Sequence, residues 1–145
     1  MKPPLLTVMT LLITLLTTNA MLLSQNIMAH GNGQDIERKL LSSTALPNLP
    51  NHSLTSVVIE LKPGSSAPSH KHEGFVFVYV IKGKVLSQLN QADPVAYASG
   101  DNWVEHPGDQ HAITRNLSKN ESAKILAVFV AENGAKLTTS GEISH

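Results

Sequence analysis

Residues 64–83 read GSSAPSHKHEGFVFVYVIKG and join a histidine pair to a strongly apolar run. Within 75–81 the only polar side-chain atom is the hydroxyl oxygen of Tyr79. A strand of this composition indicates a closed barrel core or a dimer interface, because neither of its faces suits water. We therefore expect both faces of this strand to be covered.

Short apolar runs recur on either side of this strand, separated by Gly, Pro, Asn and Asp. Together with 75–81 they lie at 54–61, 84–89, 94–98, 102–105 and 123–130. Six such runs predict an all-β domain, an antiparallel sandwich or small barrel, over 54–131. We expect 30–53 to be a loop-like N-terminal extension, with at most a short helical turn at Ile36–Leu41. We expect 132–145 to be a polar, peripheral C-terminal tail.

The composition excludes several classes of function. Eleven Lys and Arg balance eleven Asp and Glu among 145 residues, so no excess of positive charge suggests a nucleic acid partner. The chain has no cysteine, which excludes disulfides, thiolate-bound zinc, iron–sulfur clusters and thiol nucleophiles.

The first 29 residues are typical of a signal peptide. Lys2 precedes the uncharged stretch LLTVMTLLITLL at 5–16. Cleavage after Ala20 or Ala29 fits the small-residue rule, and Ala29 is preferred because the chain turns polar at His30. The prediction is a periplasmic or secreted protein without a membrane span after cleavage. The alternative is an uncleaved N-terminal anchor.

Three histidines form a candidate metal site. His70 and His72 are two residues apart, so in a strand both rings point to the same face. His111, just after the Pro107-Gly108 turn, is the candidate third ligand. Imidazole ligands suit one divalent transition metal, Fe or Mn first, with Ni, Cu or Zn as alternatives. The competing interpretation is an exposed histidine pair without a metal.

The spacing of these residues resembles two motifs of the cupin superfamily. The first motif, G-x5-H-x-H-x3–4-E-x6-G, is matched by Gly64, His70, His72 and Gly83. The second, G-x5-P-x-G-x2-H-x3-N, is matched with small shifts by Gly100, Gly108, His111 and Asn116. The resemblance implies a jelly-roll β-barrel (a double-stranded antiparallel β-helix) with one metal inside, and a homodimer.

The chain departs from the family pattern at the glutamate ligand. Val76 stands where the first motif has this glutamate, and His106 occupies the usual proline slot of the second motif. Glu73 directly follows His72 and should point away from the metal. The expected site is therefore a neutral three-histidine centre, with Glu73 and Glu105 as the suspects if a carboxylate takes part.

Other side chains are candidates for the pocket wall. Val76 and Tyr79 would give it a mostly apolar lining. Gln88 could support a ligand or be a fourth one, although an exposed position is favoured. Trp103 shares a strand face with Glu105, and we expect it to serve first in the core or an interface and second in the pocket. His106 is expected in a solvated turn.

Two functions follow with similar weight. One is an exported non-haem Fe(II) or Mn(II) dioxygenase or related oxidoreductase that acts on a small anionic or chelating substrate. The other is a non-catalytic barrel that binds or senses a small ligand or a metal. A structural cupin with an empty site ranks third. The fold alone does not decide among these functions, because function resides in the site.

Overall fold

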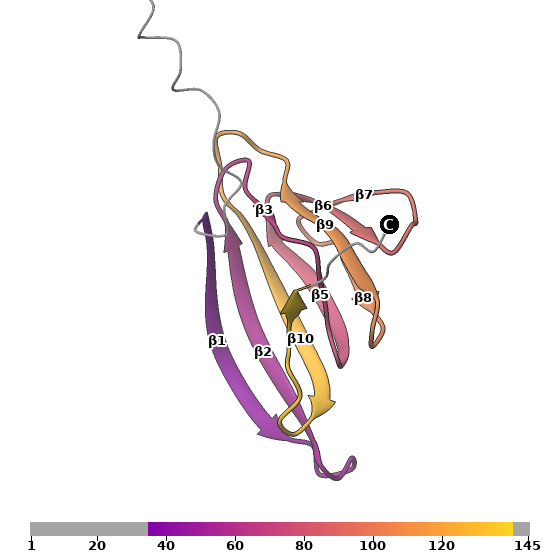
Figure 1. Ribbon diagram of the computed structural model, residues 1–145. Helices are drawn as coiled ribbons and strands as arrows, with labels where there is room; N and C mark the ends of the chain where they lie inside the picture. Colours follow the sequence, from indigo (N-terminus) through magenta and orange to yellow (C-terminus); the bar gives the residue numbers. More distant parts are fainter. Residues whose placement is uncertain (1–34, 141–145) are drawn as a thin grey trace, which may run out of the picture. The chain divides into compact units, whose positions relative to one another are not determined.

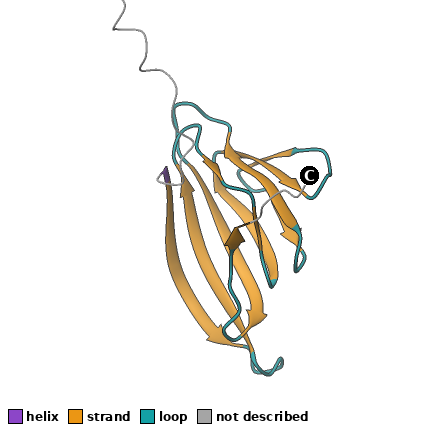
Figure 2. Ribbon diagram, viewed as in Figure 1, coloured by secondary structure: helices purple, strands orange, loops and turns teal. Residues whose placement is uncertain are grey.

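The computed structural model describes residues 35–140, which fold into eleven β-strands joined by turns and loops (Figure 2). The strands are β1 (Ile36–Ala45), β2 (His52–Leu61), β3 (Ser66–Ala67), β4 (His70–Lys71), β5 (Phe75–Lys82), β6 (Lys84–Leu89), β7 (Val95–Ala98), β8 (Asn102–Glu105), β9 (Gln110–Asn116), β10 (Ala123–Glu132) and β11 (Thr139–Ser140). All six runs predicted from the sequence are strands.

The strands form two antiparallel sheets. One has the order β1-β2-β10-β5-β8, and the other has the order β11-β4-β9-β6-β7, with β3 paired to β9 (Figure 1). Several neighbours in each sheet are far apart in the sequence, as in the pairing of β2 with β10 and of β4 with β9. This architecture confirms the predicted all-β jelly-roll fold.

The predicted signal peptide at 1–29 lies outside the described residues, as do His30 and His145. Within 35–140, no helix has the length and apolar character needed to cross a membrane.

Strand β5 shows why the core lies between the sheets. Val76, Val78 and Val80 point inward and are at most 2% exposed, whereas Tyr79 and Ile81 on the other face are 39% and 42% exposed. The expectation that both faces would be covered is wrong for the single chain, because strand alternation turns every second side chain outward. The predicted homodimer, which could cover this outer face, stays a prediction.

The N-terminal extension corrects a second expectation. Residues 36–45 form strand β1 rather than a loop with a helical turn at Ile36–Leu41. The backbone pairs with β2 from Ile36 opposite Leu61 to Ala45 opposite Ser53. The charged and exposed side chains of β1 are typical of a strand at the edge of a sheet. Its apolar residues are spaced as in a helix, which explains the expected helical turn.

Four further strands lie outside the six predicted runs, and three of them, β3, β4 and β11, are only two residues long. In β9, a shift of register against β6 lets His111 and Thr114, three residues apart, both be buried. The burial pattern therefore lacks the alternation that identifies a strand. In the tail, Thr139–Ser140 pairs with β4 as β11, so the tail packs beside the histidine pair instead of being peripheral.

A close approach of two strands explains Gly74. A Cβ atom at this position would lie 2.5 Å from the carbonyl oxygen of Val130 on β10. Only glycine allows the chain to pass so near to β10, and this passage carries it from the histidine pair into β5.

Candidate metal centre

The structure brings the three predicted histidines together. His70 on β4 lies opposite His111 on β9 in the strand register, and His72 follows β4 directly. The ring centroid of His70 lies 4.9 Å from that of His72 and 5.0 Å from that of His111. One nitrogen of each ring lies within 4.8 Å of the others, so the three could hold one metal ion.

Backbone carbonyls orient two of the rings. The Nδ1 atom of His70 donates to the carbonyl oxygen of Pro68 at 2.8 Å, and that of His72 donates to the carbonyl oxygen of Leu137. A carbonyl oxygen can only accept, so each Nδ1 carries the proton and each Nε2 of a neutral ring keeps a free lone pair. This arrangement, in which a second partner fixes the ring, is typical of metal-bound histidines.

Burial keeps His70 in the form that binds metal. Burial lowers the pKa of this ring to about 4, although the hydrogen bond to Pro68 opposes the shift. The imidazole is therefore neutral at physiological pH and needs to lose no proton before it binds an ion.

His111 is held in a different way. Its Nε2 atom lies 2.8 Å from the Ser87 hydroxyl and 3.0 Å from that of Thr114. Its Nδ1 atom is the one that faces the site, 3.2 Å from Oε1 of Glu105. In the structure, Nδ1 donates to the Glu105 carboxylate. A metal could take this place once the ring proton is on Nε2, which can donate it to a hydroxyl and leave Nδ1 with the lone pair.

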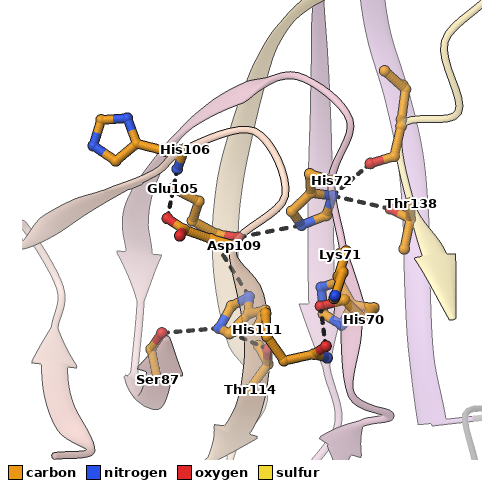
Figure 3. Close-up of polar contacts among 12 residues, drawn as sticks. His70, Lys71, His72, Ser87, Glu105, His106, Asp109, His111, Thr114 and Thr138 are labelled. Carbon is orange, nitrogen blue, oxygen red and sulfur yellow. Dashed lines mark hydrogen bonds and ion pairs between the residues drawn. The ribbon is translucent and has the colours of Figure 1, made fainter. Parts of the chain in front are cut away.

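Glu105 lies beside this cluster, with its carboxylate 3.3 Å from His72 and 3.2 Å from His111 (Figure 3). Its side chain is 1% exposed, and its Oε1 atom accepts a hydrogen bond of 3.0 Å from the indole nitrogen of Trp103. Burial would raise the pKa of this carboxyl, but the hydrogen bond and charge of His111 and the bond from Trp103 outweigh it and hold the pKa below the usual value. The group is an anion at neutral pH.

Among the described residues, the candidate ligand set is the three predicted histidines, and Glu105, one of the two suspected carboxylates, lies next to them. Glu105 on β8 lies directly opposite Val76 on β5 in the strand register, and both side chains point inward. A carboxylate thus occupies the position next to the one where the family motif has its glutamate. Strand alternation predicts from the sequence that Trp103 and Glu105 share one face. Only the pairing of β8 with β5 shows that this face lies beside the histidines.

One atom of this cluster lacks a partner in the part of the chain that the structure describes. Oε2 of Glu105 is buried without a hydrogen bond, although it lies 3.3 Å from Nε2 of His72. When the His72 ring is neutral, Nδ1 holds its proton, so Nε2 and Oε2 face each other with lone pairs only. A cation between them would satisfy both, so the residues present fit a metal ion.

Two of the other predicted pocket residues line the site. Val76, 1% exposed, lies on the cavity wall. Trp103 has both of its expected roles, because its ring packs against Tyr97 at a centroid distance of 4.6 Å and also lines the cavity.

Four predicted residues point elsewhere. Tyr79 is on the outer face of β5. Gln88 is half-buried, and its amide donates to the carbonyl oxygen of Ala92 in the following turn, not to a histidine. Glu73 is exposed and accepts a hydrogen bond from the backbone of Lys136. The exposed His106 ring packs on Phe75, apart from the cluster (Figure 3).

A cavity of about 540 Å³ opens from the histidines along the inner face of the five-stranded sheet. Its wall is mostly aliphatic and aromatic, and its polar end carries the cluster. The apolar lining residues are Ile36, Leu40, Val57, Ile59, Leu61, Ala67, Pro68, Val76, Val78, Trp103, Ile125, Ala127, Phe129 and Leu137. A site of this size and lining suits a small organic molecule.

Comparisons with solved structures support the fold. An uncharacterized conserved protein with a double-stranded beta-helix domain from Klebsiella pneumoniae is 21% identical, with a TM-score of 0.61 over 82% of this chain and 100% of that chain. KdgF from a Halomonas species is 20% identical, with a TM-score of 0.55 over 69% and 82%. The DMSP lyase DddQ from Ruegeria pomeroyi is 16% identical, with a TM-score of 0.62 over 80% of this chain.

At these identities the likeness shows the fold alone. The matched part is 58% of the Ruegeria pomeroyi lyase chain and 44% of another DMSP lyase chain. No curated protein matches the sequence.

The family itself follows from the sequence. The family model described as "Cupin domain" matches residues 57–129, which is half of the chain and includes both motifs and most strands of both sheets. With its jelly-roll strands and inward-facing histidines, this chain belongs to the cupin family.

Proposed function

We propose that the protein binds one divalent transition metal through His70, His72, His111 and Glu105, and holds a small organic ligand in the adjoining cavity. The observation that carries this proposal is the buried Oε2 atom of Glu105, which has no hydrogen-bond donor and faces the ring of His72. Three imidazoles and a carboxylate suit Fe or Mn, and also Ni, Cu or Zn.

The chain's own residues prepare this centre. Ser87 and Thr114 hold the His111 ring, and the Leu137 carbonyl holds that of His72. Trp103 fixes Glu105, whose negative charge offsets part of the charge of a divalent ion. A bound metal would supply a Lewis acid and open coordination positions next to the cavity.

Metal binding is tested with Glu105→Gln, which keeps the shape of the side chain and removes its charge. We expect this change to weaken the affinity for Mn²⁺ about 10–100-fold, and His70→Ala to abolish binding. Glu73→Gln is the matched control, since that carboxylate points away from the site. Isothermal titration and elemental analysis of untagged protein give the affinities and the occupancy.

A double substitution sharpens the test. Val76→Glu combined with Glu105→Val moves the carboxylate across the strand pair to the family's usual position. We expect the double variant to bind Mn²⁺ more tightly than Glu105→Gln. The proposal fails if Glu105→Gln or His70→Ala binds as much metal as the unchanged protein.

Oxygen-dependent catalysis is the second candidate, in the form of a non-haem dioxygenase. It is supported by the contact between the apolar cavity and the histidines, which would let a bound ligand reach the metal away from bulk water. The alternative remains a barrel that binds or senses its ligand without converting it.

Oxygen uptake by the Fe(II)-loaded protein separates these two functions. With catechol, flavonol, diketone and thiol substrates, a dioxygenase should consume oxygen with at least one class, and His111→Ala should stop the uptake. Flat uptake across all four classes in protein that binds metal normally would contradict catalysis and favour the binding barrel.

Export is a separate proposal that rests on the sequence of residues 1–29. If these residues are a cleaved signal peptide, the mature chain has 116 residues (145 − 29) and begins at His30. Intact-mass measurement of protein expressed with its own N-terminus should give that species in the exported fraction. A full-length chain retained in the membrane would instead indicate an anchor.

A further inference from the structure

Among the described residues that line the cavity, Arg38 is the one with a permanent positive charge. It lies on β1 between Ile36 and Leu40, and these three alternate residues all face the cavity. The neighbouring Glu37 and Lys39 point to the opposite side of the strand, where Glu37 pairs with Lys62 at 2.7 Å. Within 35–140 the structure shows no ion pair that involves Arg38.

Arg38 stands at the mouth of the cavity. Strands β1 and β11 are the outer strands of their sheets, and both contribute exposed lining residues. On β1 these are Arg38 and Leu40, the latter 62% exposed, and on β11 it is Ser140. At the other edges the sheets close, because Tyr97 of β7 packs on Trp103 of β8. A ligand therefore enters between β1 and β11.

The position of Arg38 separates it from the metal centre. Glu105 is on β8, at the edge of the sheet opposite β1, which is four strand spacings or about 19 Å along the sheet surface. The wall between them is apolar. A molecule that meets both ends would carry an apolar body and an anionic group distinct from the group presented to the histidines.

We propose that Arg38 binds the carboxylate of an elongated amphipathic ligand whose apolar body lies along the cavity wall. This inference rests on the proposed function, since the far end of such a ligand is what the histidine cluster would receive. A guanidinium group matches a carboxylate through two parallel hydrogen bonds, and few other groups near the mouth could recognise an anion.

Trp103 provides the measurement, because it is the only tryptophan of the chain and lines the cavity. The probes are octanoate and octanamide, which share an apolar chain and differ in charge. Titrations followed by tryptophan fluorescence use protein stripped of metal, so that the carboxylate cannot bind through an ion. We expect octanoate to bind about tenfold more tightly than octanamide.

The variant Arg38→Gln should weaken octanoate binding about tenfold and leave octanamide binding unchanged. Lys39→Gln is the matched control, since it removes the same charge from the same strand on the opposite face. It should behave like the unchanged protein. Because both side chains are exposed on an edge strand, neither change should disturb folding.

Three results would overturn the inference: equal affinity for the two probes, equal effects of the two variants, or no fluorescence response to either probe. The experiment is independent of metal binding. If the protein does not bind Mn²⁺ but still prefers octanoate through Arg38, the proposed metal centre fails and the ligand site stands. If the protein binds Mn²⁺ normally but shows no preference for octanoate, the metal centre stands and the ligand site at Arg38 fails.

Discussion

A carboxylate enclosed by imidazole rings is the constraint on which the rest of this molecule depends. Moving an ionised group from water into a protein costs on the order of several kcal/mol unless it is paired and hydrogen-bonded. Glu105 receives one hydrogen bond from Trp103 and faces His111 and His72, yet Oε2 has no donor among residues 35–140. The fold thus holds an incompletely compensated anion at its centre, and a bound cation would complete its surroundings.

The pairing of strands in the two sheets brings Glu105 and the histidines together. The pairing of β8 with β5 aims Glu105 inward, and the pairing of β4 with β9 sets His70 opposite His111. The tail adds β11 beside β4 and supplies the carbonyl that orients His72. The position of each ligand atom therefore depends on contacts between segments far apart in the sequence. The cavity lies beside these ligand atoms, where the two sheets separate at their β1 and β11 edges.

Local patterns were enough to predict much of the fold, but the parts nearest the site were harder. Alternation and turn residues identified six strands, and the spacing of His70, His72 and His111 identified the cluster. The strands that were missed break the pattern for physical reasons. β1 is an exposed edge, and β9 contains a bulge that buries His111 and Thr114 together. Glu105 was named only as a suspect, because its role comes from strand pairing that no local pattern contains.

The central claim is that one metal ion lies between the three histidines and Glu105. Anomalous diffraction from crystals of the Mn²⁺-loaded protein, collected near the absorption edge of manganese, tests it most directly. A metal held as proposed gives a single strong peak in contact with all four side chains. A peak at another place, or an ion held by the histidines while the carboxylate of Glu105 turns away from it, rules out this arrangement.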